Sequence, residues 1–215
     1  MGDAGPEHRR FRVVAAEPSH LEGMARCHVA CFPAQFMSHV GGRYTRAFYQ
    51  AYLEDPKGLA FVAVSEEDGR VVGLVGGGDA DIRARFLRRA PGRFLGTLLV
   101  KCVTDRVVRS KVFEALAQKL RLSRKRKEEP ARPAPGEAPR AMLQVVCVLP
   151  EARGAGAAPA LVEAFRKACR DAGYRTMELT VATDNARALG FYRKTGWQVA
   201  GQDVRNTSMW RSAGD

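Results

Sequence analysis

The chain has 215 residues, a length that favours one domain over two. Its residues are 46% hydrophobic and 27% charged, which provides for a packed core and excludes a disordered chain. The net charge is +12, no run of 18 apolar residues occurs, and the acidic start Met1-Gly2-Asp3 lacks the basic and apolar regions of a secretory signal. Five cysteines without regular spacing suit a reducing compartment, so we expect a cytoplasmic protein.

The first elements predicted are a strand and a helix. The stretch from Phe11 to Ala16 is apolar and predicts a strand, which Pro18 closes. Ser19 then stands where its side chain would cap a helix that runs to about Cys31.

Two cysteines lie one helical turn apart on that first helix, at Cys27 and Cys31. A zinc site would need two further ligands with suitable geometry, and cysteine is commonly a small buried residue on helices. We therefore predict that the protein holds no metal.

A second helix and a hairpin follow. Gly41-Gly42 precedes the helix, and four of its apolar side chains share one face: Tyr44, Phe48, Ala51 and Tyr52. Two apolar runs, 59–65 and 71–75, are joined by the turn sequence Glu66-Glu-Asp-Gly69. This arrangement predicts a hairpin and the start of an antiparallel sheet.

Residues 81–140 are predicted to form an inserted helical excursion. Between Arg83 and Lys127 there are 15 Lys or Arg residues and two acidic residues, a local charge of +13 that leaves −1 for the rest of the chain. Apolar pairs recur there with a helical period, Pro91-Gly92 splits the pattern, and residues 128–139 form a Pro- and Ala-rich loop. Three roles remain open: a solvated charged face, a contact with an anionic macromolecule or membrane surface, and a roof over an acyl or acceptor cavity.

The C-terminal third alternates strands and helices. Residues 142–149 are nearly all apolar, which predicts a strand covered on both faces. A helix is expected over about 159–171, with Gly173 as its terminator. The remaining elements expected are a buried strand at 177–182, a short helix at 185–195 and closing strands at 197–200 and 208–211. Together these elements predict an α/β or α+β domain with a mixed sheet.

A small-residue loop lies between the strand at 142–149 and the helix that follows. In Pro150-Glu-Ala-Arg-Gly-Ala-Gly-Ala-Ala158 the backbone is bare, so successive N–H groups and the helix N-terminus can converge on an anion such as a pyrophosphate. The spacing does not fit a dinucleotide fingerprint, which needs a third glycine, or a P-loop, which needs Lys followed by Ser or Thr. Alone, such a loop is also compatible with an ordinary turn.

Two motifs at this separation resemble the Gcn5-related N-acetyltransferase (GNAT) family. The segment 148–158 is similar to the family's coenzyme A loop, and 178–197 is similar to its strand, Asn-containing turn, Tyr helix and Gly-aromatic end. The resemblance implies a mixed, mostly antiparallel central sheet flanked by helices, here with the basic helical insertion before the coenzyme A-binding strand. It also implies transfer of an acyl group from acetyl-CoA or a longer acyl-CoA to an amine.

The resemblance implies roles for particular residues. Backbone groups of Val146, Cys147 and Val148 would contact the pantetheine arm, Asn185 would hydrogen-bond it, and Tyr192 would protonate the departing thiolate. The pyrophosphate would lie on a loop of six residues: Arg153, Gly154, Ala155, Gly156, Ala157 and Ala158.

The general base and the acceptor site are less defined. Gln144 stands on the strand where many relatives have a carboxylate, and an amide can orient a water or the amine but cannot take its proton at neutral pH. A water chain or a residue from elsewhere could serve instead: Glu66, Glu67, Glu151, His20, His28 or His39. The aromatic-rich stretch 32–39 is expected either to border the acceptor or to pack as a linker.

The sequence therefore predicts an acyl-CoA-dependent N-acyltransferase that acts on a small-molecule or peptide amine. Fatty-acyl transfer to a peptide or amino-sugar amine is the alternative within that class. A non-enzymatic module of this fold that binds nucleic acid or a membrane surface is the alternative outside it, and residues 83–127 would supply the anionic contact.

Overall fold

The structure, a computed structural model, describes residues 10–89, 91–124 and 139–214. The expectations for the N-terminal residues 1–9 and for most of the Pro- and Ala-rich loop fall outside these residues. The described strands are β1 (Phe11–Ala15), β2 (Gly58–Ser65), β3 (Val71–Gly78), β4 (Arg140–Val148), β5 (Thr176–Ala182), β6 (Gln198–Gln202) and β7 (Asn206–Ser212). They form one sheet in the order β1-β2-β3-β4-β5-β7-β6, antiparallel except where β4 meets β5.

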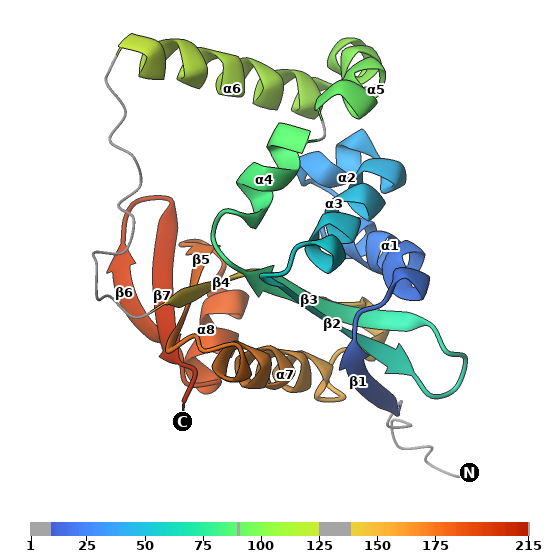
Figure 1. Cartoon of the computed structure of the whole chain (residues 1–215), viewed down its shortest axis with the longest axis vertical. Coiled ribbons are helices and arrows are strands. Elements are labelled where there is room, and N and C mark those ends of the chain that lie inside the picture. Colours follow the sequence, from blue (N-terminus) through green and yellow to red (C-terminus); the bar gives the residue numbers. More distant parts are fainter. Residues whose placement is uncertain (1–9, 90, 125–138, 215) are drawn as a thin grey trace, which may run out of the picture.

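Helices cover both faces of this sheet (Figure 1). One face carries α1 (Leu21–Cys31) and α3 (Gly42–Glu54), with the short α2 (Phe36–Val40) beside them, and the other carries α7 (Ala157–Asp171) and α8 (Ala186–Lys194). Three further helices, α4 (Ile82–Arg89), α5 (Pro91–Thr104) and α6 (Arg106–Arg124), precede β4 and lie beyond α2 and α3. The predicted mixed, mostly antiparallel sheet with a basic helical insertion is therefore confirmed, and no described helix has the length and apolar character needed to cross a bilayer.

Alternation along the strands divides the apolar side chains between two cores, a first core on the side of α1 and α3 and a second core on the side of α7 and α8. In β2, Val62 and Val64 face α1 and α3, whereas Ala63 between them faces α7. In β3, Leu74 and Val75 divide in the same way. Because successive side chains of a strand point to opposite faces, the nearly continuous apolar runs of the sequence are what a sheet covered on both sides requires.

The start of the first helix differs from the prediction. Ser19 does not cap α1, because Pro18–His20 forms a short 3-10 turn (η1) and α1 begins after it at Leu21. The Glu17 N–H donates to Nδ1 of His20 at 3.0 Å, so the histidine side chain satisfies a backbone group at this turn. Pro18 takes the first position of the turn, and Ser19 therefore falls inside it.

The basic helices are attached to the domain through aromatic and charged contacts. The rings of Phe86 on α4 and Phe94 on α5 pack edge to face on Tyr44 of α3, with centroids 5.5 and 5.2 Å away. Nε of Arg85 donates to Asp55 at 2.7 Å, since the end of α3 lies beside α4. The apolar stripe that the sequence shows therefore has an inner part that belongs to the first core.

Candidate active site

The strands β4 and β5 are paired at one end only. Their parallel ladder joins 140–142 to 176–178 and goes no further. Beyond it, β4 keeps its pairing with β3 and β5 keeps its pairing with β7. The facing edges from Leu143 to Val148 and from Leu179 to Ala182 thus have no ladder partner among the described residues. Backbone groups in the middle of a sheet need hydrogen-bond partners, so this opening is suited to an extended ligand that supplies them.

A bulge interrupts β4 beside this opening. Val145 lies opposite Gly76 and Leu143 opposite Gly77, so Gln144 is an extra residue without a partner on β3. The Tyr52 hydroxyl on α3 donates to Oε1 of Gln144 at 2.6 Å. Burial raises the pKa of Tyr52 above its ordinary value, and this keeps the phenol protonated and able to donate.

The hydrogen bond from Tyr52 determines which atoms of the Gln144 side chain are free to bind a substrate. With Oε1 engaged, the NH₂ group of Gln144 makes no hydrogen bond to another described residue and remains available as a donor. An amide has no basic site at neutral pH. The side chain can therefore orient a substrate group but cannot accept the proton of an amine.

The loop before α7 has the bare backbone that the sequence predicts. Gly154 and Gly156 have φ values of 87° and 85°, a left-handed conformation that favours glycine, and a Cβ at either would meet no atom within 4 Å. The N–H groups of residues 154–158 donate to no other described residue. Since they lie at the N-terminal end of α7, they are unpaired donors at the positive end of the helix and suit an anion.

Two side chains predicted to contact the donor are already engaged locally. Nε of Arg153 donates to the Val148 carbonyl at 3.1 Å, which turns the guanidinium back to the end of β4. Oδ1 of Asn185 accepts from the Ala188 N–H at 3.1 Å and caps α8. Asn185 is exposed, and its amide NH₂ can still donate.

Tyr192 lies on α8 in the second core. Its ring packs edge to face on Phe191 and Trp197, with centroids 5.2 and 5.7 Å away, and burial raises the pKa of Tyr192 to about 12. Its hydroxyl makes no hydrogen bond to another described residue. Gln144, in contrast, is bonded to Tyr52 of the first core, so the two predicted catalytic side chains approach the sheet from opposite faces.

The three histidines considered as bases have structural partners. His20 bonds the turn before α1, and Nδ1 of His39 lies 2.8 Å from Asp105 at the start of α6. Nδ1 of His28 lies 2.6 Å from the Tyr49 hydroxyl, and burial lowers the pKa of His28 to about 4, so the imidazole is neutral. Among the candidate carboxylates, Glu66 and Glu67 are exposed in the turn between β2 and β3, and Glu151 is exposed in a short 3-10 helix after β4.

The stretch 32–39 packs on the domain. Phe32, Phe36 and Met37 are partly buried against the first core, and the ring of Phe36 lies edge to face with Tyr44. This supports the linker interpretation, while a border with the acceptor stays a prediction.

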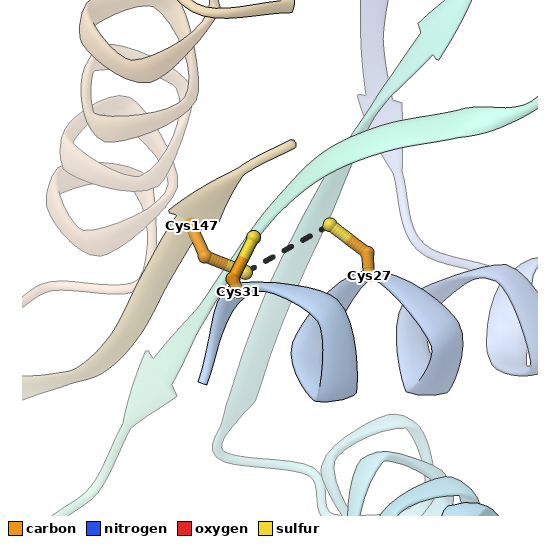
Figure 2. Close-up of side chains that lie close together, drawn as sticks. All are labelled: Cys27, Cys31 and Cys147. Atoms are coloured by element: carbon orange, nitrogen blue, oxygen red, sulfur yellow. Dashed lines mark hydrogen bonds between the residues drawn. The ribbon is translucent and has the colours of Figure 1, made fainter. Parts of the chain in front are cut away.

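The contact between the Cys147 side chain and the two cysteines of α1 is not predicted by the sequence. Its side chain points from β4 toward α1, where its Sγ lies 3.9 Å from Sγ of Cys27, and Cys31 completes a cluster of three thiols (Figure 2). The thiols of Cys147 and Cys27, together with the Arg153 guanidinium, lower the pKa of Cys31. Spacing along the chain relates Cys27 to Cys31, but no local signal relates either of them to a residue on β4.

Comparisons with known proteins agree with this geometry. Residues 21–197 match the sequence profile of the family described as the acetyltransferase (GNAT) family. The crystal structure of SsHAT is 21% identical, covers 95% of this chain and 99% of its own, and superimposes with a TM-score of 0.61. The PaiA N-acetyltransferase of Thermoplasma acidophilum, solved in complex with coenzyme A, is 11% identical over 94% of this chain and 99% of its own, with a TM-score of 0.58. A spermidine N-acetyltransferase SpeG chimera from Vibrio cholerae and hSSAT is 13% identical over 94% and 95%, with a TM-score of 0.54. No curated protein matches the chain.

Proposed function

We propose that this chain, which belongs to the acetyltransferase (GNAT) family and is a transferase, moves an acyl group from an acyl-coenzyme A donor to an amine acceptor. The observation that carries the proposal is the opening between β4 and β5, which lies beside a loop of unpaired N–H groups. An extended arm with an anionic end is the ligand that such an arrangement accommodates, and coenzyme A has that form. The coenzyme A complex of the Thermoplasma protein, which shares the fold, supports this assignment.

The donor would be held mainly by backbone groups. Val146, Cys147 and Val148 would bond the pantetheine arm along the free edge of β4, with residues 180–182 across the opening. The pyrophosphate would accept hydrogen bonds from the N–H groups of residues 154–158. Arg153 would add its positive charge near the same end, and the Asn185 amide would donate to the arm.

The attack of the amine and the protonation of the leaving thiolate would take place on opposite faces of the sheet. The amine nitrogen would attack the thioester carbonyl from the side of Gln144, whose NH₂ can orient the reacting groups while β4 backbone N–H groups stabilise the negative charge on oxygen. The C–S bond would then break, and Tyr192 on the opposite face would give its proton to the departing sulfur. The proton lost by the amine would pass to water, because the described histidines are bound elsewhere.

The acyl group and the acceptor are proposed only as classes. Acetyl-CoA or a longer acyl-CoA is the donor, and a small-molecule or peptide amine is the acceptor. Fatty-acyl transfer to a peptide or amino-sugar amine is the variant of this proposal that the apolar side chains of α4–α6 would favour if they lined an acyl channel.

A second role is favoured by the surface of α4–α6. Leu95, Leu99, Val103 and Phe113 have 55%, 62%, 77% and 64% of their surface exposed, in a segment with a charge of +13 between residues 83 and 127. Exposed aliphatic and aromatic side chains among basic residues suit the interface of an anionic bilayer, where apolar groups enter the acyl region and each basic residue adds about 1 kcal/mol. A nucleic acid would engage the charges and leave these apolar side chains in water. We therefore propose that this surface contacts an anionic membrane.

The activity is tested by thiol release from a series of acyl-CoA donors with pools of amines, peptides and amino sugars. We expect acceptor-dependent release with at least one donor, and the acylated product identifies the acceptor. A folded protein that neither releases thiol nor binds any acyl-CoA by calorimetry would overturn the proposal.

A further inference from the structure

Three thiols from distant parts of the chain share one small volume. Cys27 and Cys31 come from successive turns of α1, and Cys147 comes from β4 (Figure 2). Their Sγ atoms all lie within 4.8 Å of one another. Among the described residues, no other group of three or more His, Cys, Asp or Glu side chains comes this close in an arrangement that could hold an ion.

The distances are close to those of a metal site. Zinc–thiolate bonds are about 2.3 Å long, so two sulfurs bound to the same tetrahedral zinc are about 3.8 Å apart. Sγ of Cys27 and Sγ of Cys147 are already 3.9 Å apart. Cys31 is half-buried and so has more room to adjust than the other two thiols, which are buried.

The composition of the cluster selects the kind of ion. Thiolate sulfur is a soft ligand that prefers zinc or copper(I) to magnesium or calcium, and the cluster contains no carboxylate. Three thiolates around one zinc ion leave one net negative charge. The Arg153 guanidinium interacts electrostatically with Cys31 and would offset that charge.

We propose that Cys27, Cys31 and Cys147 form a three-thiolate site for one Zn²⁺ ion, with the fourth position open to water or an external ligand. Binding breaks the S–H bonds of those thiols that are protonated, forms three Zn–S bonds and releases the protons to solvent. The half-buried Cys31 gives the ion a route into the cluster.

Such a site would clamp α1 to the strand next to the proposed donor site. Cys147 lies between Val146 and Val148, whose backbone groups we assign to the pantetheine arm. A bound ion would therefore restrain the free edge of β4 and raise affinity for the donor. This consequence rests on the proposed function, whereas metal binding itself does not.

The test is a zinc titration of the full chain, reduced and freed of metal, in the absence of any acyl-CoA. With a chromophoric chelator as competitor, we expect about one equivalent of Zn²⁺ to bind and the half-buried Cys31 to become protected from a thiol reagent. Cd²⁺ in place of Zn²⁺ should give the thiolate charge-transfer absorption of a sulfur-rich site.

Matched variants distinguish the loss of a cysteine in the cluster from the loss of a cysteine elsewhere in the chain. Cys147→Ala and the milder Cys31→Ala should weaken binding by roughly 100-fold or more, above the 10- to 100-fold that outer-shell changes cost. Cys169→Ala removes a buried thiol of the second core outside the cluster and should bind zinc as the wild type does.

Equal zinc affinity in the wild type and in a folded Cys31→Ala variant would overturn the proposal. A disulfide within the cluster of the air-purified protein, combined with no zinc binding after reduction, would also overturn it. Zinc binding without acyl-CoA binding would contradict the proposed function and leave the metal site in place.

Discussion

The Tyr52 hydroxyl donates a 2.6 Å hydrogen bond to Oε1 of Gln144, a residue 92 positions away in the chain. This bond joins α3, on one face of the sheet, to the bulge in β4 where the strand leaves its partner β5. Because no other described residue hydrogen-bonds the Gln144 side chain, its orientation depends on Tyr52. The helix therefore positions a polar group at the opening that we propose for the thioester.

Replacing Tyr52 by Phe removes this bond and keeps the ring in place. We expect kcat to fall by about 10-fold because Gln144 loses its orientation, with little change in donor affinity, since backbone groups hold the donor. The free energy of unfolding should drop by about 1 kcal/mol, as for the loss of one intramolecular hydrogen bond. Steady-state kinetics and denaturant unfolding measure the two effects.

Tyr49→Phe is the matched control, because it also removes a 2.6 Å hydroxyl contact, in this case the buried one to His28. It should cost similar stability and leave kcat nearly unchanged. If the two variants lower kcat equally, Tyr52 has no specific role at the site.

Elements with strong local signals were predictable from the sequence. The hairpin of β2 and β3 follows from apolar runs around Glu66-Glu-Asp-Gly69, and the break between α4 and α5 follows from Pro91. The end of α7 is marked by Gly173, whose φ of 83° is the left-handed conformation of a helix terminator. These signals lie within a few residues of the structure that they specify.

Relationships across long sequence separations were not predictable in this way. The bulge at Gln144 depends on the register between β3 and β4, and the cysteine cluster depends on how α1 packs on β4. Ser19 shows the limit even for local signals, because Pro18 started a 3-10 turn that displaced the expected cap. The motifs identified the loop before α7, but only the fold reveals that β4 and β5 separate beside it.

The Gly156 position tests the proposed pyrophosphate loop. Gly156→Glu puts a negative side chain into the open space above the N–H groups of residues 154–158, so we expect acyl-CoA binding to be lost in calorimetry. The left-handed φ of 85° adds about 1 to 2 kcal/mol of backbone strain.

Gly173→Glu controls for that strain. Gly173 lies just beyond the other end of α7, with a φ of 83°, and a Cβ at this position would also meet no atom within 4 Å. The Gly173→Glu protein should lose similar stability and retain donor affinity. Unchanged affinity in a folded Gly156→Glu protein would remove the loop from the donor site.

Tyr192→Phe tests the proposed acid. The change keeps the ring in its contacts with Phe191 and Trp197 and removes the proton, so turnover should fall by roughly 10- to 1000-fold with donor affinity little changed. Turnover at the wild-type rate would exclude Tyr192 as an essential acid.

The pH profile gives a separate test of the same residue. Burial disfavours the phenolate and raises the pKa of Tyr192 to about 12, so the acid form persists through neutral and moderately alkaline pH. A loss of kcat caused by ionisation of Tyr192 should therefore begin only near pH 11. A wild-type alkaline loss centred below pH 10 that is absent from Tyr192→Phe would contradict the raised pKa of Tyr192 and would still support its role as the acid.

The exposed apolar side chains of α5 distinguish an acyl channel from a membrane contact. Leu95 and Leu99 are more than half exposed, whereas Leu98 packs partly against the first core, so a Leu95→Ser/Leu99→Ser variant should fold normally. If these leucines enter a bilayer, each contributes up to about 1.5 kcal/mol, and the double variant should bind anionic vesicles about 10- to 100-fold more weakly in a flotation assay. Its turnover of acetyl-CoA and of long-chain donors in solution should stay unchanged.

Val204→Ser, which alters an almost fully exposed side chain outside the basic helices, is the control and should bind vesicles as the wild type does. Added salt should weaken binding in all three proteins because it screens the basic residues. If the double variant instead loses turnover of long-chain donors, keeps turnover of acetyl-CoA and binds vesicles as the wild type does, these leucines line an acyl channel.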